Sequence, residues 1–119
     1  MRNESEVRQF AEEWIRSWNA HALEAILSHY APEVVLTSPA AARLLKDESG
    51  MVKGVSALRQ YFRRGLDAYP NLKFELVDVL RGISSVILYY KNQNGSMTGE
   101  FMEFDASHKV TRVVANYSL

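Results

Sequence analysis

The sequence of 119 residues has no cysteine, only three prolines and no excess of either charge. Without cysteine the chain can form neither a disulfide framework nor a thiolate zinc site. Its longest apolar runs are far shorter than the ~20 residues that cross a membrane, and its first residues lack the apolar segment of a signal peptide. These absences predict a cytoplasmic protein without a membrane partner.

The charge balance argues against a further class of partner. Lysine and arginine number 14, as do aspartate and glutamate, for a net charge of +0. Nucleic-acid binding needs a basic surface, so we expect no nucleic-acid partner. The hydrophobic content of 47% is enough for a sizeable core, and the length suits a single domain over residues 1–119.

The chain begins with a helical pattern. Asn3 and Glu6 have the spacing of a capping box, in which each side chain bonds the other residue's backbone N–H. Apolar residues then recur at three- and four-residue steps as far as Trp18. This stripe predicts an amphipathic helix that ends near Asn19.

Two more helices are expected before the middle of the chain is passed. Residues 23–30 carry a second apolar stripe, which Pro32 should end, and a third helix should follow Gly54. Between them, residues 40–53 are predicted to form an irregular loop with one helical turn over 41–45. A loop of that length in a small domain is often a lid or a mouth.

The remaining segments have the composition of strands. Residues 34–37 form a short β-branched run, and longer runs follow at 72–80, 83–92, 97–105 and 110–118. Helices first and an antiparallel meander afterwards predict the α+β class, with the helices packed on one face of a curved sheet.

One hairpin carries most of the chemical information. Asn94-Gly95 is the strongest short signal for a two-residue type I′ turn, and that turn would place Tyr89 opposite Glu100. Because side chains alternate between faces, one face would hold Ile87, Tyr89, Glu100, Met102 and Phe104. A carboxylate among these apolar side chains is either surface-exposed or desolvated for a purpose.

These two alternatives for Glu100 predict different chemistry. If it faces a pocket, burial raises its pKa, and the carboxyl can donate a hydrogen bond or act as an acid or base near neutral pH. If it reaches the surface, it can pair with Arg43 or Lys46 of the loop. His29 is expected on the surface, and no histidine or carboxylate cluster has the spacing of a metal site.

The same register leaves apolar side chains on the other face of the hairpin. There we expect Val86, Leu88, Tyr90 and Phe101, with Val114 and Asn116 pointing the same way. A sheet exposed on one side usually alternates apolar with polar residues. An apolar outer face therefore predicts a homodimer formed through it.

The chain resembles the nuclear transport factor 2-like superfamily and, within it, SnoaL-like and ketosteroid isomerase-like proteins. The markers are the segments 23–34, 53–66, 101–105 and 110–113, whose order and spacing agree over nearly the whole length. The resemblance implies a cone-shaped α+β roll of the cystatin-like type. In it, three N-terminal helices pack on a curved, mainly antiparallel sheet that leaves a pocket at its wide end.

The resemblance also implies positions for a site. The catalytic base of ketosteroid isomerases falls on Ser38, and the two oxyanion donors fall on Trp14 and Glu100. Serine without an activating base cannot abstract a proton from carbon, so the sequence predicts a protein that is not a true ketosteroid isomerase. The last strand's inward face should include Tyr117.

The sequence thus predicts a protein with a pocket for a small apolar molecule and no cofactor. Glu100 and Tyr30 are the predicted catalytic residues of an acid/base isomerase or cyclase acting on a carbonyl or enol compound. The predicted ligand-binding residues are Trp14, Trp18, Ser38, Phe62, Tyr89, Met102 and Tyr117. The alternative is a non-catalytic ligand-binding or dimerisation module, because fold alone does not fix activity.

Overall fold

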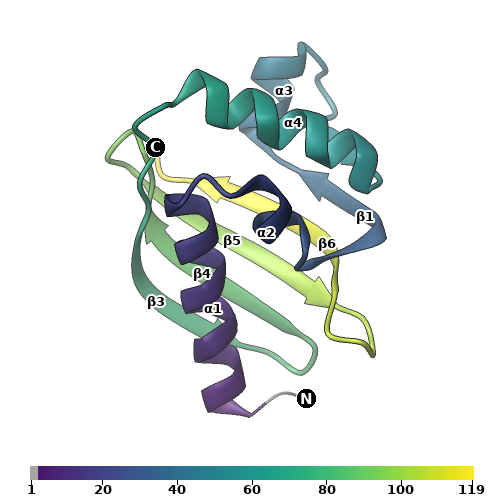
Figure 1. Cartoon of the computed structure of the whole chain (residues 1–119), viewed down its shortest axis with the longest axis vertical. Helices are drawn as coiled ribbons and strands as arrows, with labels where there is room; N and C mark the ends of the chain where they lie inside the picture. Colours follow the sequence, from purple (N-terminus) through teal and green to yellow (C-terminus); the bar gives the residue numbers. More distant parts are fainter. Residues whose placement is uncertain (1–2) are drawn as a thin grey trace.

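Helices cover one face of a curved sheet in the computed structural model, which describes residues 3–119 (Figure 1). The helices of this region are α1 (Glu4–Asn19), α2 (Leu23–Leu27), α3 (Pro39–Leu45) and α4 (Val55–Ala68). The strands are β1 (Tyr30–Thr37), β2 (Met51–Lys53), β3 (Glu75–Arg81), β4 (Ser85–Lys91), β5 (Met97–Phe104) and β6 (Val110–Tyr117). The predicted α+β class is confirmed.

The six strands form one sheet in the order β2-β1-β6-β5-β4-β3. Among the described strands, the β1–β6 pair is parallel and every other neighbouring pair is antiparallel. α1 lies across the β3 side of the sheet, whereas α4 contacts β1 and β2. In Figure 1 the C-terminal ends of α1 and α4 both lie near the end of β6 and the C-terminus.

α1 forms for the reasons that its sequence predicts. The side chain of Asn3 accepts the backbone N–H of Glu6 at 2.8 Å, and Glu6 accepts the backbone N–H of Asn3 at 3.2 Å. The buried face of the helix runs from Val7 to Trp18. At its end, the Asn19 side chain both accepts from and donates to the backbone of Phe74, which fixes the helix against the chain entering β3.

The predicted second helix is too long. α2 ends at Leu27, and Tyr30 and Pro32 belong to β1 instead. The parallel ladder between β1 and β6 is irregular between Tyr30 and Val35, where proline supplies no N–H for pairing. Because the pairing with β6 is interrupted there, β1 can contain Pro32, the residue that was expected to end the second helix.

Within the loop predicted over residues 40–53, the helical turn expected at 41–45 is confirmed as part of the longer helix α3, whereas residues 51–53 form β2 instead of loop. Pro39 occupies the first turn of α3, a position that suits its fixed φ. Ser38 caps the helix by accepting the backbone N–H of Ala40 at 3.1 Å. After α3 ends at Lys46, with a φ of 54°, the chain returns to pair β2 with β1. Residues 39–45 and 51–53 are therefore regular secondary structure.

The predicted register of the β4–β5 hairpin is wrong by one residue. Glu100 lies opposite Leu88, and Tyr89 lies opposite Gly99. The cause is the turn: the Gly95 N–H bonds the carbonyl of Asn92, and Asn94 does not adopt the positive φ that a type I′ turn requires. The Asn92 side chain accepts the N–H groups of Asn94 and Ser96, and this stabilises a three-residue loop.

The corrected register exchanges the two faces of β4. Val86, Leu88 and Tyr90 are buried on the inner face with Glu100, whereas Ile87 and Tyr89 are 37% and 39% exposed on the outer face. Three of the side chains expected on the outer face are therefore core residues. An apolar outer surface still exists, and it consists of Leu80, Ile87, Tyr89, Phe101 and Val114.

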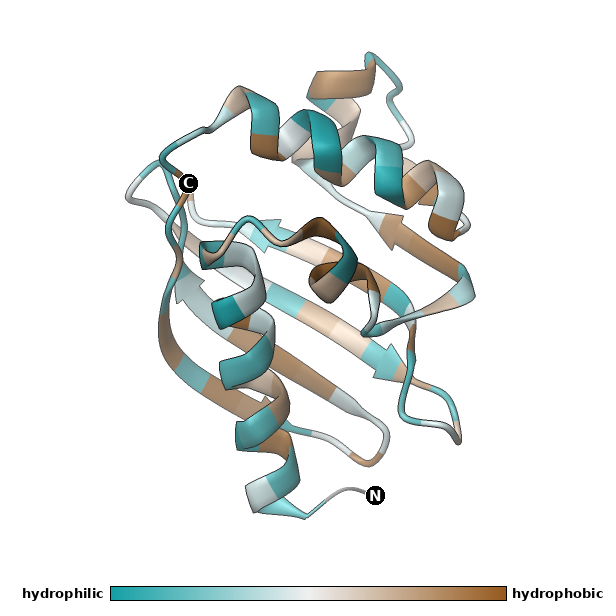
Figure 2. Cartoon of the chain, viewed as in Figure 1, coloured by the Kyte–Doolittle hydropathy of each residue, from teal (hydrophilic) through white to brown (hydrophobic). Residues whose placement is uncertain are grey.

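Hydropathy follows this layering (Figure 2). The visible side of α1 is largely hydrophilic, and hydrophobic residues recur along the strands behind it. The buried core joins α1, α2 and α4 to the inner face of the sheet. No helix in residues 3–119 is long and apolar enough to span a membrane.

Candidate functional site

A cavity of about 480 Å³ lies between the helices and the inner face of the sheet. Its walls are largely aromatic: Trp14 and Trp18 come from α1, Phe62 from α4, and Tyr90 and Tyr117 from the sheet. That volume suits a small molecule, and a mainly apolar wall with few polar groups is typical of ligand pockets.

Glu100 is the only carboxylate among the described residues that line this cavity. It sits on β5 between Leu88 and Ala115 of the neighbouring strands and is 6% exposed. Burial raises the pKa of this carboxyl from 4.5 to about 7, and the hydrogen bond from Tyr90 lowers it in part. Near neutral pH, Glu100 can therefore both release and accept a proton.

Tyr90 fixes the position of that carboxyl. Its phenol donates a hydrogen bond of 2.6 Å to Oε1 of Glu100. Burial raises the pKa of Tyr90 well above its usual range and the carboxylate adds to this, while a hydrogen bond with Thr98 acts in the opposite direction. The phenol therefore remains a proton donor to Glu100 at any physiological pH.

The hydrogen bonding continues to the tip of the hairpin. Asn92 Nδ2 donates to the Thr98 hydroxyl at 3.0 Å, and Asn92 also accepts from the turn residues Asn94 and Ser96. The turn that sets the strand register is thus linked through Asn92, Thr98 and Tyr90 to Glu100. Connected buried hydrogen bonds of this kind make a site rigid.

The two indoles of α1 differ in their hydrogen bonding. Trp14 Nε1 donates to the Tyr30 hydroxyl at 2.9 Å, so its N–H is already paired. Trp18 packs edge-on against Phe62, with 4.8 Å between ring centroids, and its Nε1 is buried without a partner among residues 3–119. A buried indole N–H usually has a partner, so Trp18 is the exception in this wall.

Hydroxyl groups cluster at another part of the wall. The Ser38 and Tyr117 hydroxyls lie 3.3 Å apart, and Ser38 also hydrogen-bonds to Tyr61. Since Ser38 caps α3 as well, its hydroxyl has a structural role. Nothing around it in the described chain provides the general base that a catalytic serine needs.

The structure brings together part of the predicted site. The predicted residues that line the cavity are Trp14, Trp18, Phe62, Glu100 and Tyr117. Tyr30 and Ser38 lie behind them and bond Trp14 and Tyr117, and Met102 is a core residue. Tyr89 lies on the outer face, so its predicted place in the pocket is wrong.

Sequence reasoning missed several lining residues. Tyr90 was assigned to the outer face by the register error, and Arg43 was expected only as a surface partner of Glu100. Asn92 does carry a signal: an asparagine two residues before Asn94 can accept backbone N–H groups of the turn, which favours the longer loop.

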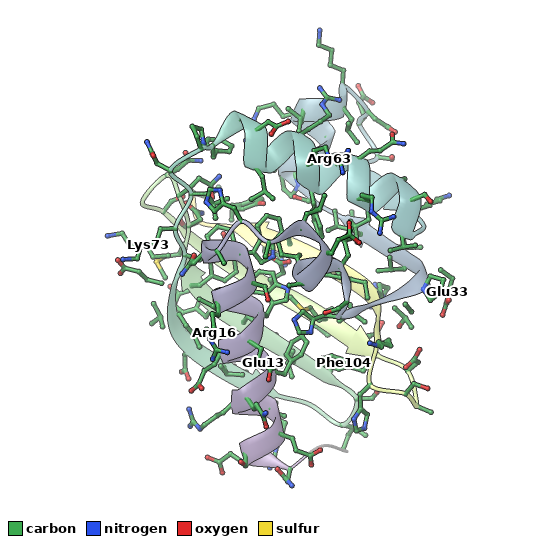
Figure 3. The ribbon with its side chains drawn as sticks, in the orientation of Figure 1. Glu13, Arg16, Glu33, Arg63, Lys73 and Phe104 are labelled. Carbon is green, nitrogen blue, oxygen red and sulfur yellow. The ribbon has the colours of Figure 1, made fainter. Side chains whose placement is uncertain are left out.

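Charged side chains elsewhere are mostly on the surface. Figure 3 shows Glu13 and Arg16 on the side of α1 that faces away from the sheet, and Arg63 on the outer side of α4. Within residues 3–119, no group of three histidine, aspartate or glutamate side chains could hold a metal ion.

The fold and the cavity together define an α+β roll with a pocket at its wide end. The SnoaL-like domain family matches residues 11–115. The chain therefore belongs to the SnoaL-like family, and the resemblance seen in the sequence is confirmed. Among curated proteins, none matches the sequence.

Solved structures agree with this assignment. A SnoaL-like protein of unknown function from Burkholderia thailandensis is 34% identical, with a TM-score of 0.95 over 98% of each chain. A protein with a cystatin-like fold from Methylobium petroleophilum has 14% identity and a TM-score of 0.78, over 98% of this chain and 78% of that one. A candidate ketosteroid isomerase from Kribbella flavida has 17% identity and a TM-score of 0.76, over 97% and 79%. The last two similarities show the fold alone.

Proposed function

We propose that this protein is a cofactor-independent acid/base catalyst of the isomerase or cyclase type, acting on a small apolar molecule with a carbonyl or enol group. The observation that carries the proposal is Glu100, a carboxyl buried in an aromatic cavity with a pKa raised to about 7. Perturbed carboxyls in clefts are typical of catalytic acids and bases.

The chemistry follows from the geometry of the carboxyl. Tyr90 occupies Oε1 of Glu100, so Oε2 is the oxygen offered to a substrate. Its carboxylate takes a proton from the carbon next to a carbonyl, and the resulting acid returns the proton to the same carbon or to a neighbouring one. A pKa near the working pH favours both transfers, and the aromatic wall excludes competing water.

The test uses β-tetralone, an apolar bicyclic ketone with acidic protons next to its carbonyl. In deuterated water, we expect the protein to accelerate exchange of these protons, with a pH profile that inflects near 7. Glu100→Gln should lower the rate by about a hundredfold or more. Exchange can be followed by proton NMR.

The control is Glu103→Gln on the same strand. Glu103 is ion-paired with Arg112 on the outer face, so its replacement should leave exchange unchanged. Exchange that Glu100→Gln does not slow would contradict the assignment of Glu100 as the catalytic group.

Ser38 supports a second candidate function, a non-catalytic ligand-binding module. At the position where the family resemblance places a base, Ser38 instead caps α3 and bonds Tyr117. In that case, β-tetralone would bind and raise the melting temperature without faster exchange.

A further inference from the structure

Arg43 is the second charged residue of the cavity. It lines the cavity from α3 and is solvent-exposed, and Glu100 is the only other charged residue among the described ones that line the cavity. In residues 3–119, no ion pair or hydrogen bond engages its guanidinium. Arg43 is thus an unpaired cation on the wall of an apolar cavity.

Two phenols of the cavity wall interact electrostatically with both charged residues. Burial raises the pKa of both Tyr61 and Tyr117; for both phenols, Glu100 acts in the same direction and Arg43 in the opposite one. The two phenols therefore lie within electrostatic reach of both charged residues of the cavity.

The groups beside Arg43 also suit an anion. Tyr61, Tyr117 and Ser38 carry hydroxyls, which can donate to an acceptor oxygen, and an arginine guanidinium binds carboxylates with paired hydrogen bonds. The loop residues Lys46, Asp47 and Glu48 are exposed and do not line the cavity. No carboxylate of the described chain competes for this part of the wall.

We propose that Arg43, with the Tyr61 and Tyr117 hydroxyls, forms a subsite for an anionic group at the cavity mouth. The ligand class is then an aromatic or alicyclic acid, with a carboxylate or sulfonate at the mouth and an oxygen function directed toward Glu100. This inference rests on the proposed function and narrows its substrate.

The test compares two fluorescent probes with the same apolar body. Anilinonaphthalene sulfonate carries an anionic group, and N-phenylnaphthylamine lacks it. With Arg43→Gln, we expect the dissociation constant of the sulfonate to rise about tenfold, the scale of a lost charge-assisted hydrogen bond. The dissociation constant of the neutral probe should change by no more than about twofold. Added salt should reduce the preference of the wild type for the sulfonate.

Two variants serve as controls. Arg63→Gln removes an exposed arginine of α4 that does not line the cavity (Figure 3), and it should change neither constant. Gly65→Phe adds a ring at a position where a Cβ meets nothing within 4 Å and which lines the cavity. It should weaken both probes, which shows that they bind inside rather than on the outer sheet face.

The outcomes separate the subsite from the proposed function. Equal weakening of both probes by Arg43→Gln, or no weakening of the sulfonate, overturns the subsite while the cavity function stands. Failure of both probes to bind the wild type contradicts the cavity's role in ligand binding and the subsite with it. Circular dichroism of each variant checks that the fold is intact.

Discussion

Tyr90 and Glu100 are diagonal neighbours on the inner face of the sheet, and the Tyr90 phenol donates a 2.6 Å hydrogen bond to the Glu100 carboxyl. Cross-strand neighbours of this kind are within reach of long side chains. The pair holds one carboxyl oxygen in place inside an aromatic cavity.

Folding stability should depend on pH through Glu100. Its pKa is about 7 in the folded protein, against 4.5 for an ordinary glutamate, so the folded state binds the proton more tightly. The stabilisation that comes from the protonated carboxyl is fully present below pH 4.5 and is lost as the pH rises through 7. The free energy of unfolding falls by about 3 kcal/mol over this range. Urea unfolding at a series of pH values measures it.

Glu100→Gln is the matched variant for this effect. It cannot ionise, so it should lack this loss and be more stable than the wild type above pH 7. Replacing a catalytic group often makes a protein more stable and less active. A wild-type stability that stays flat or increases between pH 5 and 8, while the variant follows it, would show that Glu100 is not desolvated.

Tyr90→Phe should raise the pKa of Glu100 further. The variant removes the hydrogen bond that partly offsets burial, and charged carboxylates are stabilised by such donors. Tyr89→Phe is its control, since Tyr89 lies on the outer face and should leave the pKa unchanged. The opposite result, a shift caused by Tyr89→Phe alone, would favour the register expected from a two-residue turn.

Gly65→Ala should separate stability from binding. Glycine inside a helix is less favourable than alanine by roughly 0.5–1 kcal/mol, and a Cβ at Gly65 meets no atom within 4 Å. The variant should therefore be more stable to urea. Because Gly65 lines the cavity, it should also bind N-phenylnaphthylamine more weakly. Tighter binding would indicate that the helix at this point does not limit the space for a ligand.

The outer face of the sheet predicts a homodimer. Leu80, Ile87 and Tyr89 are 51%, 37% and 39% exposed there, and an apolar patch on the surface is typical of an interface. Ile87→Lys with Phe101→Lys should yield a folded monomer. Sedimentation of the wild type at tens of micromolar, an affinity scale of about −6 kcal/mol, should show a dimer; a wild-type monomer would contradict the prediction.

Local sequence patterns predicted the helices and strands that are formed by interactions between residues close in sequence. The capping box at Asn3 and the apolar stripe ending at Trp18 describe α1 as it is. α3 was predicted only as one helical turn over residues 41–45, because seven residues are too few to show a period, although Ser38 followed by Pro39 is a good helix start. β2 is only three residues long and exists through pairing with β1, which no local pattern can show.

The sequence was enough to predict Glu100 as a site residue, but not its hydrogen-bond partner Tyr90. Glu100 was found because a carboxyl on an apolar face is unusual, and this did not depend on which residue lay opposite. Tyr90 was placed on the wrong face of the sheet because the turn was predicted from Asn94-Gly95 alone. The side chain of Asn92 determines the turn. A change of one residue in register moves every side chain of a strand to the other face.

The titration of Glu100 tests the account most directly. The carboxyl carbon shift of Glu100, assigned by comparison with Glu100→Gln, is followed by NMR as a function of pH. We expect a midpoint near 7, as burial in the cavity requires. A midpoint close to 4.5, the value of an unperturbed glutamate, would contradict both the desolvated carboxyl and the acid/base chemistry built on it.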